Sequence, residues 1–176
     1  MFGAIVWLVA ANDESTEAEL PPGLRPVPAE AQEQIDALVD DWIEVWNEQD
    51  GEGLRDLVAD DFRYVGTYAP TTGLDGWDID RLIPFIDTSC CPSSTATDRV
   101  IVERIGLYFV AQKYTREEGS TGEFLELYTI VDDEGTLEFQ YIESWAPLGW
   151  HQLDGDQPYT PIQTQSIGWP EDPWDD

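Results

Sequence analysis

The chain has 176 residues, the length of one ordinary domain with room for a hydrophobic core. It carries 37 Asp and Glu against 8 Lys and Arg, which gives a formal net charge of -29 at pH 7. Such a surface repels nucleic-acid phosphates and anionic lipid headgroups, so we exclude nucleic acid as a partner and membrane insertion of the domain. Because the acids are dispersed, a solvated acidic surface is favoured over one that collects cations.

The N-terminal segment, residues 1–28, is predicted to lie outside the domain. Residues 1–11 (MFGAIVWLVAA) are almost wholly apolar but too few to span a bilayer. They match the hydrophobic part of a signal peptide that lacks its positive start, and the alternative is an element that packs on the domain. The acidic, proline-containing stretch that follows is typical of a linker. We therefore favour a secreted, periplasmic or extracellular location, with the cytoplasm of a salt-adapted organism as the alternative.

Helical patterns come first in the chain. Apolar residues recur at three- and four-residue spacing from Pro28 and predict an amphipathic helix that ends near residues 47–51. A second, short helix is expected with Leu54, Leu57, Val58 and Phe62 on one face, followed by a strand over residues 63–68. Residues 73–88 form a third helical region, in which Pro84 predicts either two short pieces or a kink.

Strand patterns fill the rest of the core, over residues 98–105, 107–115, 124–131 and 137–145, with a hairpin turn at 132–135. Helices followed by a meander of strands predict an α+β fold. The tail, residues 148–176, is acidic but rich in tryptophan and proline, and its aromatic residues indicate that part of it packs on the domain or on a partner.

Two segments then carry a family resemblance. Residues 41–50 (DWIEVWNEQD) and 54–64 (LRDLVADDFRY) resemble the opening of NTF2-like, or SnoaL-like, domains of the cystatin-like type. The resemblance covers residues 29–147. It implies a curved, mostly antiparallel sheet wrapped around a long N-terminal helix, a conical pocket between them, and a homodimer formed through the outer face of the sheet.

An acid in the last strand is the first candidate for chemistry. Leu137, Phe139, Tyr141, Glu143 and Trp145 alternate onto one face, which is apolar enough to be predicted to face inward. Burial of Glu143 in that wall would favour its protonated form and suit it to general acid or base work, with Tyr64 as a hydrogen-bond donor. The alternatives are an acid paired with an arginine, or an acid in water at the strand end.

Further residues are expected to line the pocket, and for the aromatic ones a plain core role is the alternative. The predicted ligand-contacting residues are Trp42, Trp46, Tyr68, Phe85, Glu126, Tyr128, Tyr141 and Trp145.

Catalytic sets known from the family are incomplete in this chain. The position of the base Asp of ketosteroid isomerases corresponds to Gly66, and the one histidine, His151, lies outside the core. Cys90, Cys91 and His151 are too few for a metal site, so neither a metal nor a cofactor is expected. The prediction is a small-molecule-binding or interaction module whose partners are a small apolar molecule and a second copy. The alternative is a cofactor-independent hydrolase, lyase or isomerase that uses Glu143 as general acid or base.

Overall fold

The computed structural model describes residues 20–65, 76–86, 94–116, 123–147 and 159–161. The signal-peptide prediction, Tyr68, both cysteines and His151 lie outside these residues. Within the described part of the chain, no helix is long and apolar enough to cross a membrane. The elements are α2 (Ala29–Glu48), the 3-10 helix η1 (Glu52–Leu57), β1 (Val58–Val65), α3 (Ile79–Ile86), β2 (Ser94–Arg104), β3 (Leu107–Arg116), β4 (Glu123–Asp133), β5 (Thr136–Pro147) and β6 (Tyr159–Pro161).

Helix α2 follows from its apolar stripe. Ile35, Leu38, Val39 and Trp42 lie on one side of the helix and are buried. The helix ends where Gln49 adopts a left-handed backbone conformation, from which its N–H donates to the carbonyl of Trp46 at 3.2 Å. The predicted helix is therefore confirmed almost to the residue.

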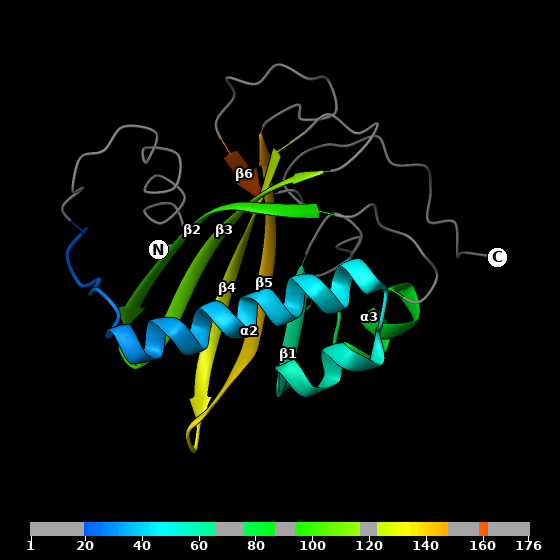
Figure 1. Cartoon of the computed structure of the whole chain (residues 1–176), viewed down its shortest axis with the longest axis horizontal. Coiled ribbons are helices and arrows are strands. Elements are labelled where there is room, and N and C mark those ends of the chain that lie inside the picture. The colour runs from blue at the N-terminus through cyan, green and yellow to red at the C-terminus, as the bar shows by residue number, and fades with distance from the viewer. Residues whose placement is uncertain (1–19, 66–75, 87–93, 117–122, 148–158, 162–176) are drawn as a thin grey trace.

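The strands form a single curved sheet in the order β1-β5-β4-β3-β2, and α2 lies across one face of it (Figure 1). Neighbouring strands are antiparallel except for β1 and β5, which run parallel. Strand β6 pairs with β5 at Trp145–Pro147, so this piece of the tail lies on the domain. The predicted α+β fold, with a curved sheet against a long helix, is confirmed.

Two tight turns fix the hairpins of this sheet. Ile105 and Gly106 join β2 to β3 with φ of 56° and 77°, and Glu134 and Gly135 join β4 to β5 with φ of 52° and 95°. Two successive positive φ angles are the geometry of a type I′ turn, whose twist matches that of the flanking strands. Glycine tolerates this region freely, whereas isoleucine and glutamate are strained in it.

Two local predictions differ from the structure. Val58 and Phe62, expected on a helix face, lie in β1, because η1 ends at Leu57 and the chain then pairs with β5. Helix α3 is one piece, so of the two alternatives predicted for Pro84 the division into two short helices is wrong; Pro84 lies within the last three residues of α3. There a proline removes only one backbone hydrogen bond from the helix.

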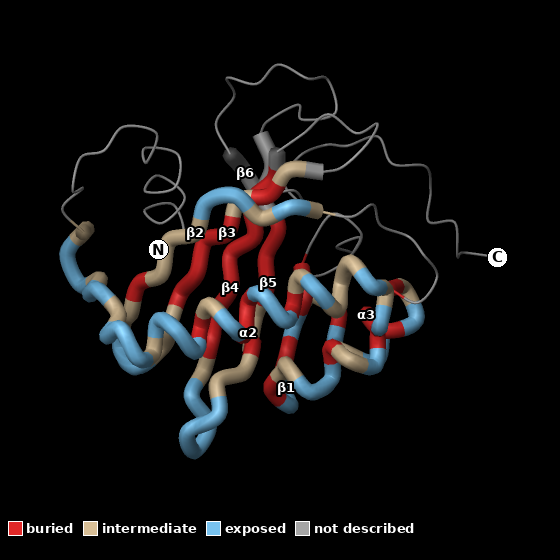
Figure 2. Tube along the Cα trace, viewed as in Figure 1, coloured by how far each residue is buried: buried red, intermediate tan, exposed pale blue. Residues whose placement is uncertain are grey.

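Residues of the central strands are mostly buried (Figure 2), and their apolar side chains form two clusters on opposite faces of the sheet. The larger cluster lies between the sheet and the helices and includes Trp42, Phe62, Tyr128, Phe139 and Ile142. The smaller one, called here the outer cluster, lies on the opposite face and consists of Val102, Phe109, Ala111, Leu125 and Leu127. Both faces of the sheet are therefore covered, and the face on which a side chain lies determines which of the two clusters it contacts.

Candidate functional site

A β-bulge in β5 decides which side chains face the helix. Thr129 of β4 pairs with Tyr141, while the next residue, Ile130, pairs with Phe139, so Gln140 is an extra residue in β5. The alternation of side chains reverses there, and Phe139 and Ile142 both lie in the inner core. It follows that Ser144 also faces inward and that Tyr141 and Glu143 face outward.

Glu143 therefore lies on the outer face. It pairs with Leu127 of the outer cluster on one side and with Val65 on the other, and its exposed fraction is 8%. Burial, followed by the charge of Glu143, raises the pKa of Tyr141 to about 12, which places these two side chains near each other. Because Tyr64 faces inward, the sheet separates Glu143 from the hydroxyl that was expected to assist it.

Ser144 takes the inward position instead and joins a chain of hydrogen bonds across four strands. Its hydroxyl donates to the Glu126 carboxylate at 3.2 Å and lies 3.3 Å from the Tyr64 hydroxyl. The Tyr128 hydroxyl donates to the other Glu126 oxygen at 2.7 Å and shares a short hydrogen bond with Tyr114. We call Tyr64, Tyr114, Glu126, Tyr128 and Ser144 the hydroxyl–carboxylate cluster.

The whole cluster is buried. Glu126 is 6% exposed. Tyr114 and Tyr128, which form one end of this row of hydrogen bonds, are 3% and 0% exposed. Burial, followed by the negative charge of Glu126, raises the pKa of both phenols well above the ordinary value. These phenols therefore stay protonated across the physiological range and act as neutral donors beside a carboxyl group.

A polar connection anchors this region to α2. Gln112 stands opposite Glu126 in the β3–β4 ladder and accepts from Arg99 Nε at 2.6 Å. The Arg99 guanidinium also donates to the carboxylates of Asp36 and Asp40 on α2, at 2.7 and 2.6 Å. These bonds fix the helix over the sheet beside the cluster.

Trp77 lies next to the cluster, where it forms an isolated β-bridge with Tyr64 of β1. Its backbone N–H and carbonyl exchange hydrogen bonds of 2.8 Å with those of Tyr64, so the two side chains point to the same face. The Trp77 ring is 9% exposed, yet its indole N–H has no hydrogen-bond partner among the described residues. Buried donors are nearly always paired in folded proteins, so this one is available to a bound molecule.

Comparisons with known proteins identify the fold but indicate no function. No protein-family model matches the sequence, and a search of curated proteins finds no match. Among solved structures, an NTF2-like protein of unknown function from Pseudomonas putida has a TM-score of 0.57 at 12% identity, over 77% of this chain and 100% of its own. A protein of unknown function with a cystatin-like fold from Nostoc punctiforme gives 0.53 at 12% identity, over 68% and 93%.

The protein has the NTF2-like fold. An NTF2-like protein of unknown function from Shewanella baltica, with a TM-score of 0.53 at 14% identity over 67% of this chain and 94% of its own, agrees with this. The expected resemblance is thereby confirmed for the fold.

Aromatic rings pack between α2 and the sheet. The Trp42 ring lies 5.2 Å from Phe139 and 6.1 Å from Phe62, measured between centroids. Trp46, one turn further along α2, is half-buried and lies 5.7 Å from the Tyr64 ring. Trp42 is thus a core residue, while Trp46 borders the cluster.

The remaining predicted ligand contacts are scattered. Phe85 of α3 packs edge-on against Trp77, at 5.2 Å between ring centroids. Tyr68 and the side chain of Trp145 lie outside the described residues, and Tyr141 lies on the outer face. Of the predicted contacts, Glu126 and Tyr128 form the centre of the cluster, and Tyr64, predicted as the hydrogen-bond donor, lies beside them.

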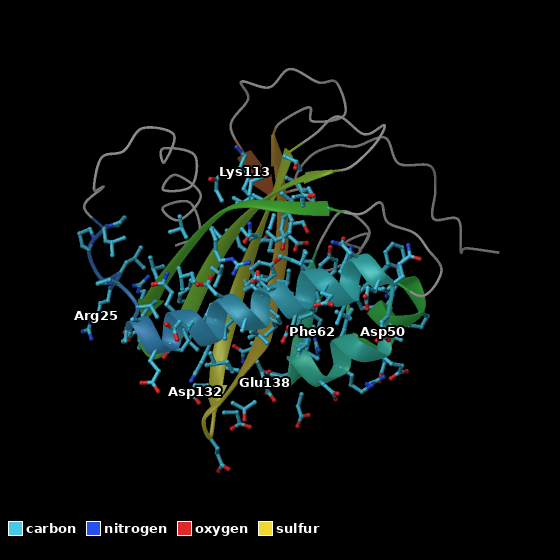
Figure 3. The ribbon with its side chains drawn as sticks, in the orientation of Figure 1. Arg25, Asp50, Phe62, Lys113, Asp132 and Glu138 are labelled. Atoms are coloured by element: carbon cyan, nitrogen blue, oxygen red, sulfur yellow. The ribbon has the colours of Figure 1, made fainter. Side chains whose placement is uncertain are left out.

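An acidic hollow of about 350 Å³ lies beside the β4–β5 hairpin, near Asp132 and Glu138 (Figure 3). Burial, then the charges of Asp133 and Asp60, raise the pKa of Glu138. Among the residues that the structure describes, no group of three or more His, Cys, Asp or Glu side chains is arranged to hold a metal ion.

Sequence reasoning missed Tyr114, Ser144 and the role of Trp77. Ser144 was assigned to the outer face because the bulge at Gln140 leaves no mark in the sequence. Tyr114 was missed because both alternating sets of β3 mix apolar with polar residues, so neither set identifies the inner face.

Proposed function

We propose that the protein is a small-molecule-binding module of the NTF2-like type whose ligand contacts the hydroxyl–carboxylate cluster. The observation that carries this proposal is the carboxyl group of Glu126, which lies 6% exposed in an otherwise aromatic interior and is held by the hydroxyls of Tyr128 and Ser144.

A buried carboxyl group such as that of Glu126 lowers the stability of the fold when it has no further role. A buried carboxyl and its hydrogen-bond partners lose their hydration, and well-packed apolar residues in their place are often as stable or more so. Polar networks that do not improve stability are concentrated at functional sites. The cluster also lies toward the strand ends, with Ser144 three residues from the end of β5 and Tyr64 one residue from the end of β1.

The hydrogen-bond donors, acceptors and apolar surface of the site indicate what kind of ligand it would bind. The hydroxyls rotate to donate or accept, Glu126 accepts, and the indole N–H of Trp77, which has no partner within the described ranges, donates. Trp46 and Phe85 add apolar surface next to these groups. The net charge of -29 disfavours anions, so the ligand is a small, mostly apolar, neutral or cationic molecule with a polar group at one end.

A titration with the neutral fluorescent dye Nile red tests the binding site. Wild type should bind the dye with a blue shift of its emission. Nile red has no hydrogen-bond donor, so the role of Glu126 is measured with 1-naphthylamine, a fluorescent neutral molecule whose amino group donates. Glu126→Gln should weaken binding of 1-naphthylamine about tenfold, the difference between a hydrogen bond to a charged acceptor and one to a neutral acceptor. Glu143→Gln is the matched control, because Glu143 is also buried in a neighbouring position but lies on the other face. Equal affinities of wild type and Glu126→Gln for 1-naphthylamine would show that the bound molecule does not contact Glu126.

Trp77→Phe provides a second, independent variant. It removes the indole N–H that has no partner among the described residues, together with part of a ring that packs on Phe85 and lies 5.0 Å from the Arg81 guanidinium. The fold therefore loses packing but none of the recorded hydrogen bonds, whereas a ligand that uses this donor loses affinity. A several-fold weaker Nile red affinity, measured at a temperature at which both proteins are folded, is the expected result. Unchanged affinity would show that Trp77 only packs.

Cofactor-independent catalysis is the second candidate, as a hydrolase, lyase or isomerase. It is favoured by the pairing of a carboxyl group with two phenols whose raised pKa keeps them protonated, which supplies a base and a hydrogen-bond donor at one place. Glu126 takes the acid or base role here, in place of Glu143. Turnover of a panel of epoxides and hydroxy-ketones that is abolished by Glu126→Gln and retained by Glu143→Gln would establish an enzyme.

A further inference from the structure

The segment before α2 crosses the edge of the sheet and touches both of its faces. Leu20 and Leu24 pack on the outer cluster, whereas Val27, only three residues later, packs on the inner core. Between them, Arg25 lies in the plane of the sheet. Residues 20–27 therefore wrap around one edge of the sheet, although the sequence suggested a linker.

Backbone hydrogen bonds hold this segment in place. Arg25 and Glu103 of β2 each donate an N–H to the other's carbonyl, both at 2.9 Å. Since β2 is the last strand of the sheet, Arg25 pairs with an edge that would otherwise offer free backbone groups at this position. A turn in which the N–H of Leu24 donates to the carbonyl of Pro21 at 3.1 Å brings the two leucines over the outer face.

The outer cluster is the part of the sheet that needs covering. Its five side chains have exposed fractions of only 0 to 3%, and Leu20 and Leu24 are among the few partly buried residues packed against them. Uncovered, contiguous leucine, valine and phenylalanine side chains on the face of a sheet form the kind of apolar patch through which proteins associate.

We propose that residues 20–27 are a built-in cover, which occupies the outer face and the β2 edge and thereby keeps a second copy of the chain from pairing there. The occupant of this face is the chain's own N-terminal segment. The homodimer through the outer face that the family resemblance implies then requires that Leu20 and Leu24 leave this face. The proposal does not depend on the binding site, which lies on the opposite face of the sheet.

Hydrogen exchange of the wild-type chain tests whether the cover is closed. The amide of Arg25 should exchange about 100-fold or more slowly than in an unstructured peptide, because its hydrogen bond to β2 must open first. Exchange of Arg25 at the rate of an unstructured peptide would overturn the proposal without any substitution.

Sedimentation of a double variant tests what the cover prevents. Leu20→Gln with Leu24→Gln replaces two covering side chains by polar ones of similar size. Ile105→Gln is the matched control, because it makes the same kind of change at a side chain that is 87% exposed.

Wild type and the Ile105→Gln control should remain monomeric, while the double variant should double its mass with rising concentration and exchange the amides of β3 and β4 faster when dilute. A double variant that stays monomeric, or a wild type that already dimerises through the outer face, would contradict the proposal.

Discussion

Replacing Glu126 by glutamine should leave the fold as stable as wild type or make it more stable, because the carboxyl group serves a ligand rather than the core. Gln keeps an acceptor oxygen and has nearly the same volume, and the hydroxyls of Tyr128 and Ser144, now 2.7 and 3.2 Å from the carboxylate, can rotate to suit an amide. Hydrogen bonds to a charged group are worth about 1.5–3 kcal/mol and neutral ones about 0.5–1.5, so the two bonds together lose about 2 kcal/mol.

The free energy gained by removing the buried charge is as large as this loss in hydrogen bonding, or larger. Burial of an ionised carboxyl costs several kcal/mol even after relaxation, and the amide does not carry that cost. We therefore expect the free energy of unfolding to rise by about 0–2 kcal/mol, and Tm by up to about 6 °C for a chain of this length. Urea unfolding followed by tryptophan fluorescence measures it, with Glu44→Gln, at an exposed acid of α2 outside the cluster, as the control.

Glu126→Leu is the contrasting variant. It leaves the Tyr128 and Ser144 hydroxyls without their buried acceptor, which should cost about 1–3 kcal/mol for each. The reasoning would be refuted by a loss of more than about 2 kcal/mol in Glu126→Gln, since the carboxylate would then be a structural support of the sheet.

Three further predictions concern the scaffold. Ile105→Asn and Glu134→Asn should each raise the free energy of unfolding by about 1 kcal/mol, because asparagine suits the positive φ of both turns; no gain in urea unfolding would mean that these turns are not strained. Arg99→Met should lower stability by about 1–2 kcal/mol, since the guanidinium joins α2 to β2 from a side chain 16% exposed, and Arg99→Lys should recover less than half of it in the same assay. The raised pKa of Glu138 means that the folded state resists its ionisation, so this group's contribution to stability is full below its ordinary pKa and is lost as the pH rises through the raised value. Glu138→Gln should thus be more stable than wild type near pH 7 and equal to it near pH 3, and an equal difference at both would contradict the cause given.

Local patterns predicted the elements because their causes are local. The apolar spacing along α2 depends only on the helix period, and the hairpin at residues 132–135 depends on glycine at a positive φ. Val58 and Phe62 were misassigned because a helical spacing of apolar residues also arises by chance in a strand that is irregularly paired, as β1 is between Val58 and Arg63.

The site could be predicted only in part because it depends on pairing between distant strands. Glu126 and Tyr128 were identified from their alternation within β4, which is regular over those residues. Glu143 was favoured over Ser144 because strict alternation was assumed through Gln140, where β5 contains its bulge. One extra residue exchanges the two faces of a strand, and only the partner strand reveals it.

The location of a bound molecule tests the central claim most directly. Nuclear magnetic resonance of protein labelled at the tyrosine rings, recorded with and without Nile red, reports separately on the two faces of the sheet. Binding at the hydroxyl–carboxylate cluster predicts that the resonances of Tyr64, Tyr114 and Tyr128 shift while that of Tyr141, on the outer face, does not. A shift of Tyr141 with the three inner tyrosines unchanged would contradict the account.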